Sequence, residues 1–244
     1  MNLLEHCIIP DWPAPAHVRS LQTTRNSGSS QPPYTSFNLG SHVGDNPLAV
    51  SRNRMLLAPL VPSEPVWLNQ VHGITVSDAG RAGCLPQADA SVSSHRGAVC
   101  VVMTADCLPV LLCDESGSVV AAAHAGWRGL CDGVIESTVQ AMKVPAPTQM
   151  AWLGPAIGPG KFEVGEEVRS AFVAQQPQAA AAFVAGADGK WLADLYQLAR
   201  LRLNALGITR VYGGGLCTYS DPARFYSYRR DGVTGRMGTF IWLS

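Results

Sequence analysis

Three short apolar runs, at residues 98–104, 109–113 and 118–123, constrain the fold more than any other feature of this sequence. Many of their residues are β-branched, and turn-forming residues separate one run from the next. Each run is shorter than an ordinary helix, whereas an unbroken apolar run of this length is typical of a strand buried on both faces. The sequence therefore predicts buried strands of a central sheet.

Other patterns predict the elements around that sheet. The predicted helices lie at residues 46–62, 130–143, 166–175 and 195–206. The further predicted strands lie at residues 66–71, 150–153, 208–212 and 237–243. Asp194 is placed to cap the last of the helices and Gly207 to end it. Strands mixed with helices predict a layered α/β sandwich with a mixed sheet, and no linker or internal repeat divides the chain.

The composition excludes several classes of protein. Hydrophobic residues make up 47% of the chain and charged residues 15%, which argues against disorder. The net charge is zero, so we expect neither a nucleic acid nor a membrane surface as partner. No apolar run reaches the roughly 18–20 residues that span a bilayer, and the N-terminus lacks the pattern of a secretory signal. The seven cysteines include no CxxC pair, which predicts reduced thiols and a cytoplasmic protein.

His72, Cys107 and His124 each lie at the end of a predicted strand, beside small residues. Because strand ends bring side chains to a common edge of a sheet, we expect the three to converge. Two imidazoles and a thiolate suit Zn²⁺ and leave a fourth position open, as in catalytic zinc sites. The separations of 35 and 17 residues match no short metal motif. Two other interpretations therefore stay open: a Cys–His nucleophile pair without metal, and three unrelated structural residues.

Further candidate residues lie outside these three segments. Residues 225–236 are dense in arginine and tyrosine, and either clamp a phosphate and stack on an aromatic base or form a solvated surface turn. Asp89 and Glu163 are each a candidate general acid or base, but we favour a role as a hydrogen-bond anchor for a loop. His42 is a possible substrate contact.

Several longer motifs occur in a fixed order from Asn38 to the C-terminal end. They are NLGSHVGDNP, SRNR, NQVHG, ADAS, TADCLPVLL, HAGWRGL, GPAIGP with FEVG, and CTY followed by FYSYRRDGVTGRMGTFIWL. With these motifs the chain resembles the YfiH-type family. Proteins of that family have been described as multicopper polyphenol oxidases or laccase-domain proteins, as purine nucleoside phosphorylases and, in some bacteria, as peptidoglycan editing factors.

The resemblance implies a single catalytic domain over residues 1–244, an α/β sandwich similar to a class of proteins described as cysteine hydrolases. It also implies that His72, Cys107 and His124 bind the metal and form the catalytic centre, with zinc as the expected metal. Copper is less expected, because the chain has no HxH pair and its six histidines are few for a multicopper cluster.

The activities implied by the resemblance are phosphorolysis of adenosine, inosine and methylthioadenosine to the free base and ribose 1-phosphate, and deamination of adenosine. The expected partners are then a purine nucleoside and phosphate. We expect Arg230, Arg229 or Arg54 to hold the phosphate through paired N–H donors. We expect His42 and Asn38 to contact the substrate.

Three alternatives use the same residues differently. The first is a Cys107-dependent hydrolase that edits misincorporated peptidoglycan precursors. The second is a copper polyphenol oxidase. The third is a binding module whose metal is structural.

Overall fold

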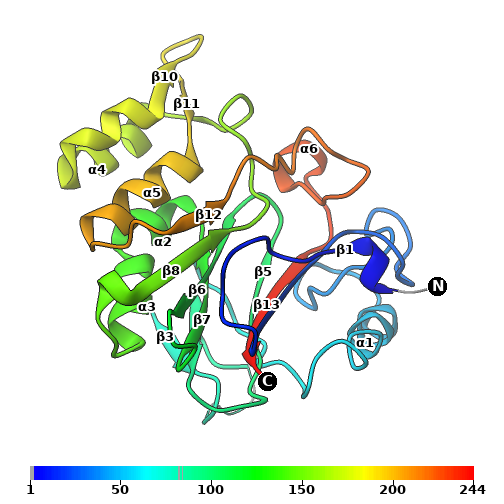
Figure 1. Ribbon diagram of the computed structural model, residues 1–244. Helices are drawn as coiled ribbons and strands as arrows, with labels where there is room; N and C mark the ends of the chain where they lie inside the picture. The colour runs from blue at the N-terminus through cyan, green and yellow to red at the C-terminus, as the bar shows by residue number, and fades with distance from the viewer. Residues whose placement is uncertain (1–2, 82, 84) are drawn as a thin grey trace.

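Two β-sheets packed face to face form the centre of the molecule (Figure 1). The computed structural model describes residues 3–81, 83 and 85–244. Apolar side chains of both sheets, such as Ile241 on one and Leu111 on the other, share one buried core between them. Helices cover the outside, so the predicted layered α/β sandwich with a mixed sheet is confirmed.

The larger sheet has six strands in the order β12-β8-β6-β7-β4-β3. These are β3 (Val76–Asp78), β4 (Ala90–Ser93), β6 (Leu108–Asp114), β7 (Val120–Ala125), β8 (Gln149–Leu153) and β12 (Val211–Gly213). The pair at each edge is parallel and the inner pairs are antiparallel. The central strands β6, β7 and β8 are buried along their whole length, which explains their nearly unbroken apolar sequences.

The smaller central sheet has four antiparallel strands in the order β1-β2-β13-β5. These are β1 (Cys7–Ile8), β2 (Val18–Thr23), β5 (Cys100–Thr104) and β13 (Met237–Leu243). The late strand β13 therefore crosses the middle of the molecule between two strands from much earlier in the chain (Figure 1). A separate three-stranded sheet consists of β9 (Glu163–Val164), β10 (Phe183–Ala185) and β11 (Trp191–Ala193).

Helices pack on the outer faces of both central sheets. On the side of the six-stranded sheet lie α2 (Trp127–Asp132), α3 (Val134–Ala141), α4 (Glu166–Gln175) and α5 (Leu195–Ala205). On the opposite side of the molecule lies α1 (Pro47–Met55) (Figure 1). The remaining helical turns are α6 (Tyr228–Asp231) and the 3₁₀ helices η1 (Leu3–His6), η2 (Ala146–Thr148) and η3 (Pro177–Ala182).

Most of the predicted elements are confirmed, two of them with the predicted bounds, namely the helix at 166–175 and the strand at 237–243. The strands predicted at 98–104, 109–113 and 150–153 and the helix at 195–206 form with ends shifted by one or two residues. Asp194 caps the last helix by accepting the Gln197 N–H at 3.0 Å.

The strand predicted at residues 66–71 is wrong. Among these described residues, pairing is limited to isolated bridges at Val66 and Asn69. The side-chain amide of Gln70 takes the place of a backbone partner: Nε2 donates to the Met103 carbonyl at 2.8 Å, and Oε1 accepts the Met103 N–H at 2.7 Å. The segment is therefore an irregular stretch tied to β5 by a side chain.

Other boundaries also differ from the predictions. The helix predicted at 130–143 is two helices that meet at Gly133, whose φ of 106° interrupts the helical geometry. The strand predicted at 118–123 lies two residues further on, at β7, and so contains His124. The predicted first helix ends at Met55 instead of near Pro62. The strand predicted at 208–212 begins only at β12, and the short strands β1–β4 and β9–β11 were not predicted.

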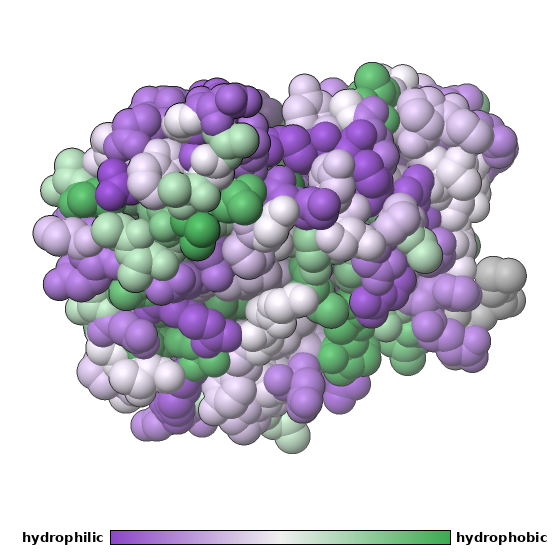
Figure 2. Space-filling view, turned by 90° about the horizontal axis from the view of Figure 1, so that it is seen from above, coloured by the Kyte–Doolittle hydropathy of each residue, from purple (hydrophilic) through white to green (hydrophobic). Residues whose placement is uncertain are grey.

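The surface seen from above the first view carries mainly hydrophilic residues, interrupted by smaller hydrophobic areas (Figure 2). Some of the most exposed apolar side chains belong to α1, where Leu48 is 67% and Met55 is 70% exposed. Among the described residues, no helix is long and apolar enough to cross a membrane.

Candidate metal centre

The structure brings His72, Cys107 and His124 together as a His–Cys–His cluster. One potential ligand atom of each lies within 4.8 Å of the others, and Sγ of Cys107 is 3.8 Å from Nε2 of His72. The two imidazole rings are inclined at 67°, with their centroids 4.8 Å apart. Nitrogen and sulfur donors at this separation can hold a transition metal. In the described part of the chain, no other three His, Cys, Asp or Glu side chains form such a group.

Three kinds of local structure position the three side chains. His124 lies within β7, opposite Pro109 of β6, and is almost fully buried. Cys107 lies in the tight turn between β5 and β6, directly after Asp106, which has a φ of 94°. His72 lies in a loop and has a φ of 62°. Left-handed backbone at a non-glycine residue is strained, so the surrounding contacts must stabilise this site.

Asp89 supplies much of that stabilisation, as a fully buried hydrogen-bond anchor. Its carboxylate accepts the backbone N–H groups of Val71 at 3.1 Å, His72 at 2.9 Å and Gly73 at 2.7 Å. It also accepts Nδ1–H of His124 at 2.8 Å. Burial acts to raise the pKa of Asp89, but the hydrogen bonds from His124, Gly73 and Val71 and the charge of His124 outweigh it and lower the pKa. The predicted anchor role of Asp89 is confirmed, and Nε2 of His124 remains as the nitrogen available to a metal.

The charges in the cluster are coupled. Burial acts to raise the pKa of Cys107, but the charge of His124 and hydrogen bonds from both histidines outweigh it and lower the pKa to about 6. Burial acts to lower the pKa of His124, but Cys107 and Asp89 outweigh it and raise the pKa to about 9. A thiolate is thus favoured at neutral pH, and a thiolate is both a metal ligand and a nucleophile. The electrostatics therefore agree with either of these interpretations.

Two glycines of the HAGWRGL motif allow the chain to approach the cluster closely. A Cβ atom on Gly126 would lie 2.7 Å from Cδ2 of His72 and 3.0 Å from Sγ of Cys107. A Cβ atom on Gly129 would lie 2.8 Å from the carbonyl oxygen of Gly73. Since non-bonded carbon atoms separate by more than this, only glycine fits at these positions without displacing the ligands.

The cluster borders a cavity of about 370 Å³, a volume suited to a small molecule. Its wall also includes His42, Gln70, Met103, Tyr228 and Arg236. The described residues that line it include no aspartate or glutamate, so the anion in its wall is the Cys107 thiolate and the cations are Arg236 and protonated His124. Burial lowers the pKa of His42, and the nearby positive charges lower it further.

Two arginines predicted to contact substrate lie away from this cavity wall. Arg230 forms an ion pair with Asp231, with Nη2 and Oδ2 2.7 Å apart, and also donates to three backbone carbonyls. Arg229 donates through Nη1 to the carbonyl of Glu163 at 2.9 Å, and its guanidinium lies over the ring of Phe162. The contacts of both arginines join the C-terminal loop to the rest of the protein. Glu163 takes part in them through its backbone carbonyl.

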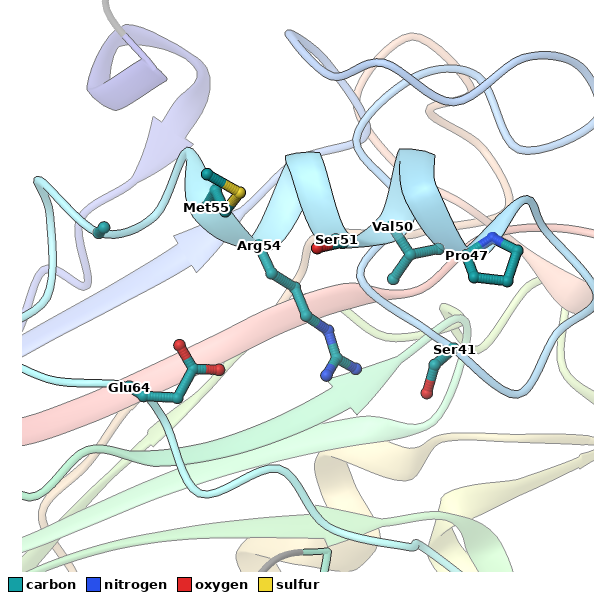
Figure 3. A pocket seen from close by; sticks show the side chains of 8 residues that line it. Ser41, Pro47, Val50, Ser51, Arg54, Met55 and Glu64 are labelled. Atoms are coloured by element: carbon teal, nitrogen blue, oxygen red, sulfur yellow. The ribbon is translucent and has the colours of Figure 1, made fainter.

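Arg54 borders a neighbouring cavity of about 490 Å³, where its guanidinium points between Ser41 and Glu64 (Figure 3). Its Nε and Nη2 both donate to the carbonyl of Leu39, at 3.0 and 2.8 Å. The guanidinium carbon lies 3.8 Å from the centre of the Trp67 ring. Arg54 thus joins the first helix to Leu39 and Trp67 and is not among the residues that line the cavity beside the His–Cys–His cluster.

The other two predicted substrate contacts have different positions. His42 is largely exposed and lines the cavity beside the His–Cys–His cluster. Asn38 is fully buried: its Oδ1 accepts the backbone N–H groups of Gly40 and Arg236, and its Nδ2 donates to Asp45. Its amide therefore holds the loop against the start of β13.

Sequence reasoning missed Gln70 and Arg236 as residues of the cavity wall. Arg236 lies in a motif that contains other arginines, and no local signal distinguishes it from them. Its place depends on the pairing of Met237 with Thr104, between two strands far apart in the chain. The chain gives no short-range signal of that pairing.

Comparison with known proteins identifies relatives along nearly the whole chain. Residues 19–244 match the sequence family described as multi-copper polyphenol oxidoreductase laccase. The chain is 56% identical over 237 residues to a Pseudomonas aeruginosa protein named purine nucleoside phosphorylase PA4543, which covers 97% of this chain and 98% of the relative. It is 55% identical over 239 residues to the Escherichia coli protein named purine nucleoside phosphorylase YfiH, with the same coverage.

Solved structures share the fold. The crystal structure of the Neisseria meningitidis protein NMB0706 superposes with a TM-score of 0.96 at 54% identity, covering 98% of this chain and 99% of that one. The structure of YlmD from Geobacillus stearothermophilus gives a TM-score of 0.87 at 30% identity, covering 93% of this chain and 92% of that one.

Proposed function

This chain belongs to the family described as multi-copper polyphenol oxidoreductase laccase, and on that premise we propose that it is a zinc-dependent purine nucleoside phosphorylase. The observation that carries the proposal is the His–Cys–His cluster in the wall of a cavity of about 370 Å³. The names of relatives at 56% and 55% identity support the activity. We propose that residues 1–244 form one catalytic domain.

The donor set fits zinc. Two imidazoles and one thiolate leave one tetrahedral position open, and Asp89 holds Nδ1 of His124 as carboxylates commonly do for a histidine that binds a metal. When bound, the metal supplies a Lewis acid beside the cavity. Copper would meet the same three donors, but a multicopper cluster needs more ligands than the described residues assemble here.

Phosphorolysis forms a bond from a phosphate oxygen to C1′ of the ribose while the bond from C1′ to the base nitrogen breaks. The base leaves with the electron pair and takes up a proton. The protein contributes by binding: Met103 and the exposed ring of Tyr228 offer apolar surface to the base. His42 offers a ring nitrogen to the polar groups of the substrate.

We propose adenosine, inosine and methylthioadenosine as substrates. Deamination of adenosine, in which water replaces the 6-amino group and ammonia leaves, would use the same cavity because it acts on the same nucleoside. Zinc-loaded protein given inosine and inorganic phosphate should release hypoxanthine and ribose 1-phosphate in equal amounts, and neither when phosphate is omitted. Ammonia release from adenosine tests the second activity. Absence of free base from zinc-loaded protein overturns the phosphorylase.

A second candidate function is a Cys107-dependent hydrolase that acts on peptidoglycan precursors. It is favoured by the lowered pKa of Cys107 and by the 3.8 Å between Sγ and Nε2 of His72. The two candidates differ in metal dependence. A cysteine hydrolase keeps its activity after thorough chelation and loses it in Cys107→Ala, whereas both treatments abolish the phosphorylase.

A further inference from the structure

We propose that Arg236, together with the hydroxyl of Thr104, binds the phosphate co-substrate in the cavity beside the His–Cys–His cluster. The inference rests on the proposed phosphorylase function, which consumes inorganic phosphate. Both residues line that cavity, unlike the arginines that the sequence pattern favours for this role.

The guanidinium of Arg236 has unused donors. Its Nη1 donates to the carbonyls of Thr234 and Gly235, at 3.0 Å each. Its Nε and Nη2 make no hydrogen bond, and no carboxylate pairs with it, within the part of the chain that the structure describes. A guanidinium edge with Nε–H and Nη2–H free matches two oxygens of one phosphate.

This cation is largely buried, and no carboxylate of the described residues forms an ion pair with it. Burial lowers the pKa of Arg236, while the charges of Cys107 and Asp106 act in the opposite direction. The carboxylate of Asp106 is already occupied, because it accepts two hydroxyl groups and the backbone N–H of Arg229, at 2.6 to 3.0 Å. A phosphate dianion would therefore compensate the cost of holding the guanidinium out of water.

Thr104 gives a second, independent observation. The residue is 1% exposed, and its Oγ1 is itself buried with no hydrogen-bond partner among the described residues, although Thr104 lines the cavity. Buried hydroxyls are normally bonded, so an unpaired one in a cavity wall indicates a ligand oxygen or a water that accepts from it. Thr104 pairs with Met237, the residue after Arg236, which puts the hydroxyl and the arginine at the same end of β5 and β13.

The path of the Arg236 side chain is fixed by its neighbours. The backbone N–H of Arg236 donates to Oδ1 of Asn38 at 2.8 Å. A Cβ atom on Gly40 would lie 2.8 Å from Cγ of Arg236, so only glycine leaves room for the arginine stem. The donors are thus held in place before phosphate arrives, which lowers the entropy cost of binding it.

The test compares zinc-loaded variants in steady-state phosphorolysis of inosine. Arg236→Met removes the donors and the charge, Arg236→Lys keeps only the charge, and Thr104→Val removes only the hydroxyl. Arg81→Met, at a side chain that is 80% exposed, is the matched control. We expect KM for phosphate to rise roughly 10- to 100-fold in Arg236→Met and less in the other two site variants. KM for inosine and zinc content should stay at the wild-type values.

Calorimetric titration with inorganic phosphate alone separates this inference from the proposed function. If the wild type phosphorolyses inosine and Arg236→Met keeps its KM for phosphate, the subsite is wrong and the function stands. If the wild type releases no base but binds phosphate, and Arg236→Met does not bind it, the function is wrong and the anion site stands. Gly40→Ala keeps the arginine but blocks its path, so it should also weaken phosphate binding even if Arg236→Met fails to fold. Wild-type protein that shows no phosphate binding by either measurement overturns the subsite.

Discussion

Oδ1 of Asp89 lies 2.8 Å from Nδ1 of His124. The same carboxylate holds the backbone N–H groups of the loop that carries His72, one of two residues with left-handed backbone at the site. A single buried side chain therefore orients one ligand ring and holds the loop of another. The geometry of the cluster depends on this side chain as much as on the three potential ligands.

Asp89→Asn should weaken metal binding roughly 10- to 100-fold. The amide is nearly isosteric, but its NH₂ group cannot accept hydrogen bonds from backbone N–H groups, so at least one of those donors loses its partner. We also expect the free energy of unfolding to fall by about 1–3 kcal/mol. Competition with a chelator and thermal unfolding measure the two effects. Asp11→Asn, at an exposed position, is the control, and unchanged metal affinity in Asp89→Asn would contradict the prediction.

Gly126→Ala should distort the cluster without unfolding the protein. The backbone of Gly126, with φ of −62° and ψ of 155°, suits alanine, but the added methyl group would lie 2.7 Å from Cδ2 of His72 and 3.0 Å from Sγ of Cys107. We expect a loss of bound metal that elemental analysis detects after dialysis. Gly160→Ala, where a Cβ atom meets nothing within 4 Å, should keep its full metal content. Equal metal content in both variants would show that the site tolerates the methyl group.

Removal of the metal should abolish phosphorolysis, and zinc should restore it. The physical reason is that removal takes away the cation that we propose His72, Cys107 and His124 hold beside the cavity. The measurement is base release before chelation, after it, and after addition of zinc or copper. Recovery with copper alone would identify a copper enzyme, and activity that persists without metal would favour the cysteine hydrolase.

Arg230→Met should destabilise the protein while leaving KM for phosphate unchanged. Arg230 pairs with Asp231 and donates to carbonyls of the preceding loop, so its loss leaves several acceptors unpaired. We expect the free energy of unfolding to decrease by about 1–3 kcal/mol. Denaturant unfolding gives the stability, and phosphorolysis at varied phosphate gives KM. A large rise in KM for phosphate with normal stability would contradict this prediction and indicate that Arg230 binds phosphate, as its motif suggested.

The sequence predicted the parts of the structure that depend on local patterns. Continuous apolar runs identified β5, β6 and β8, and helical spacing with an aspartate cap identified α5, because these signals act within a few residues. The segment at 66–71 misled the same reasoning, since Gln70 replaces a strand partner with its side chain. The apolar pattern of a sequence does not show that a side chain will take the place of a strand partner.

The convergence of the three candidate ligands was predicted, but the residues that surround them were not. A local pattern in the sequence pointed to each of the three residues, because His72, Cys107 and His124 each follow or end an apolar run. The positions of Arg236 and Thr104 depend on the pairing of β13 with β5, and the number of free N–H groups on each arginine depends on which carbonyls lie nearby. These are properties of the folded packing, so the arginine-rich motif suggested phosphate binding without indicating which arginine faces the cavity.

The three ligands come from a loop, a turn and a strand that are 35 and 17 residues apart, so an unfolded chain offers a metal no common site. A metal ion held by the proposed site would therefore bind only the native form, and mass action would make its concentration part of the folding equilibrium. Free metal at roughly 100 times its dissociation constant adds about 2.7 kcal/mol to the free energy of unfolding. Supply of the ion would then affect how much of the chain survives proteolysis, before any substrate reaches the cavity.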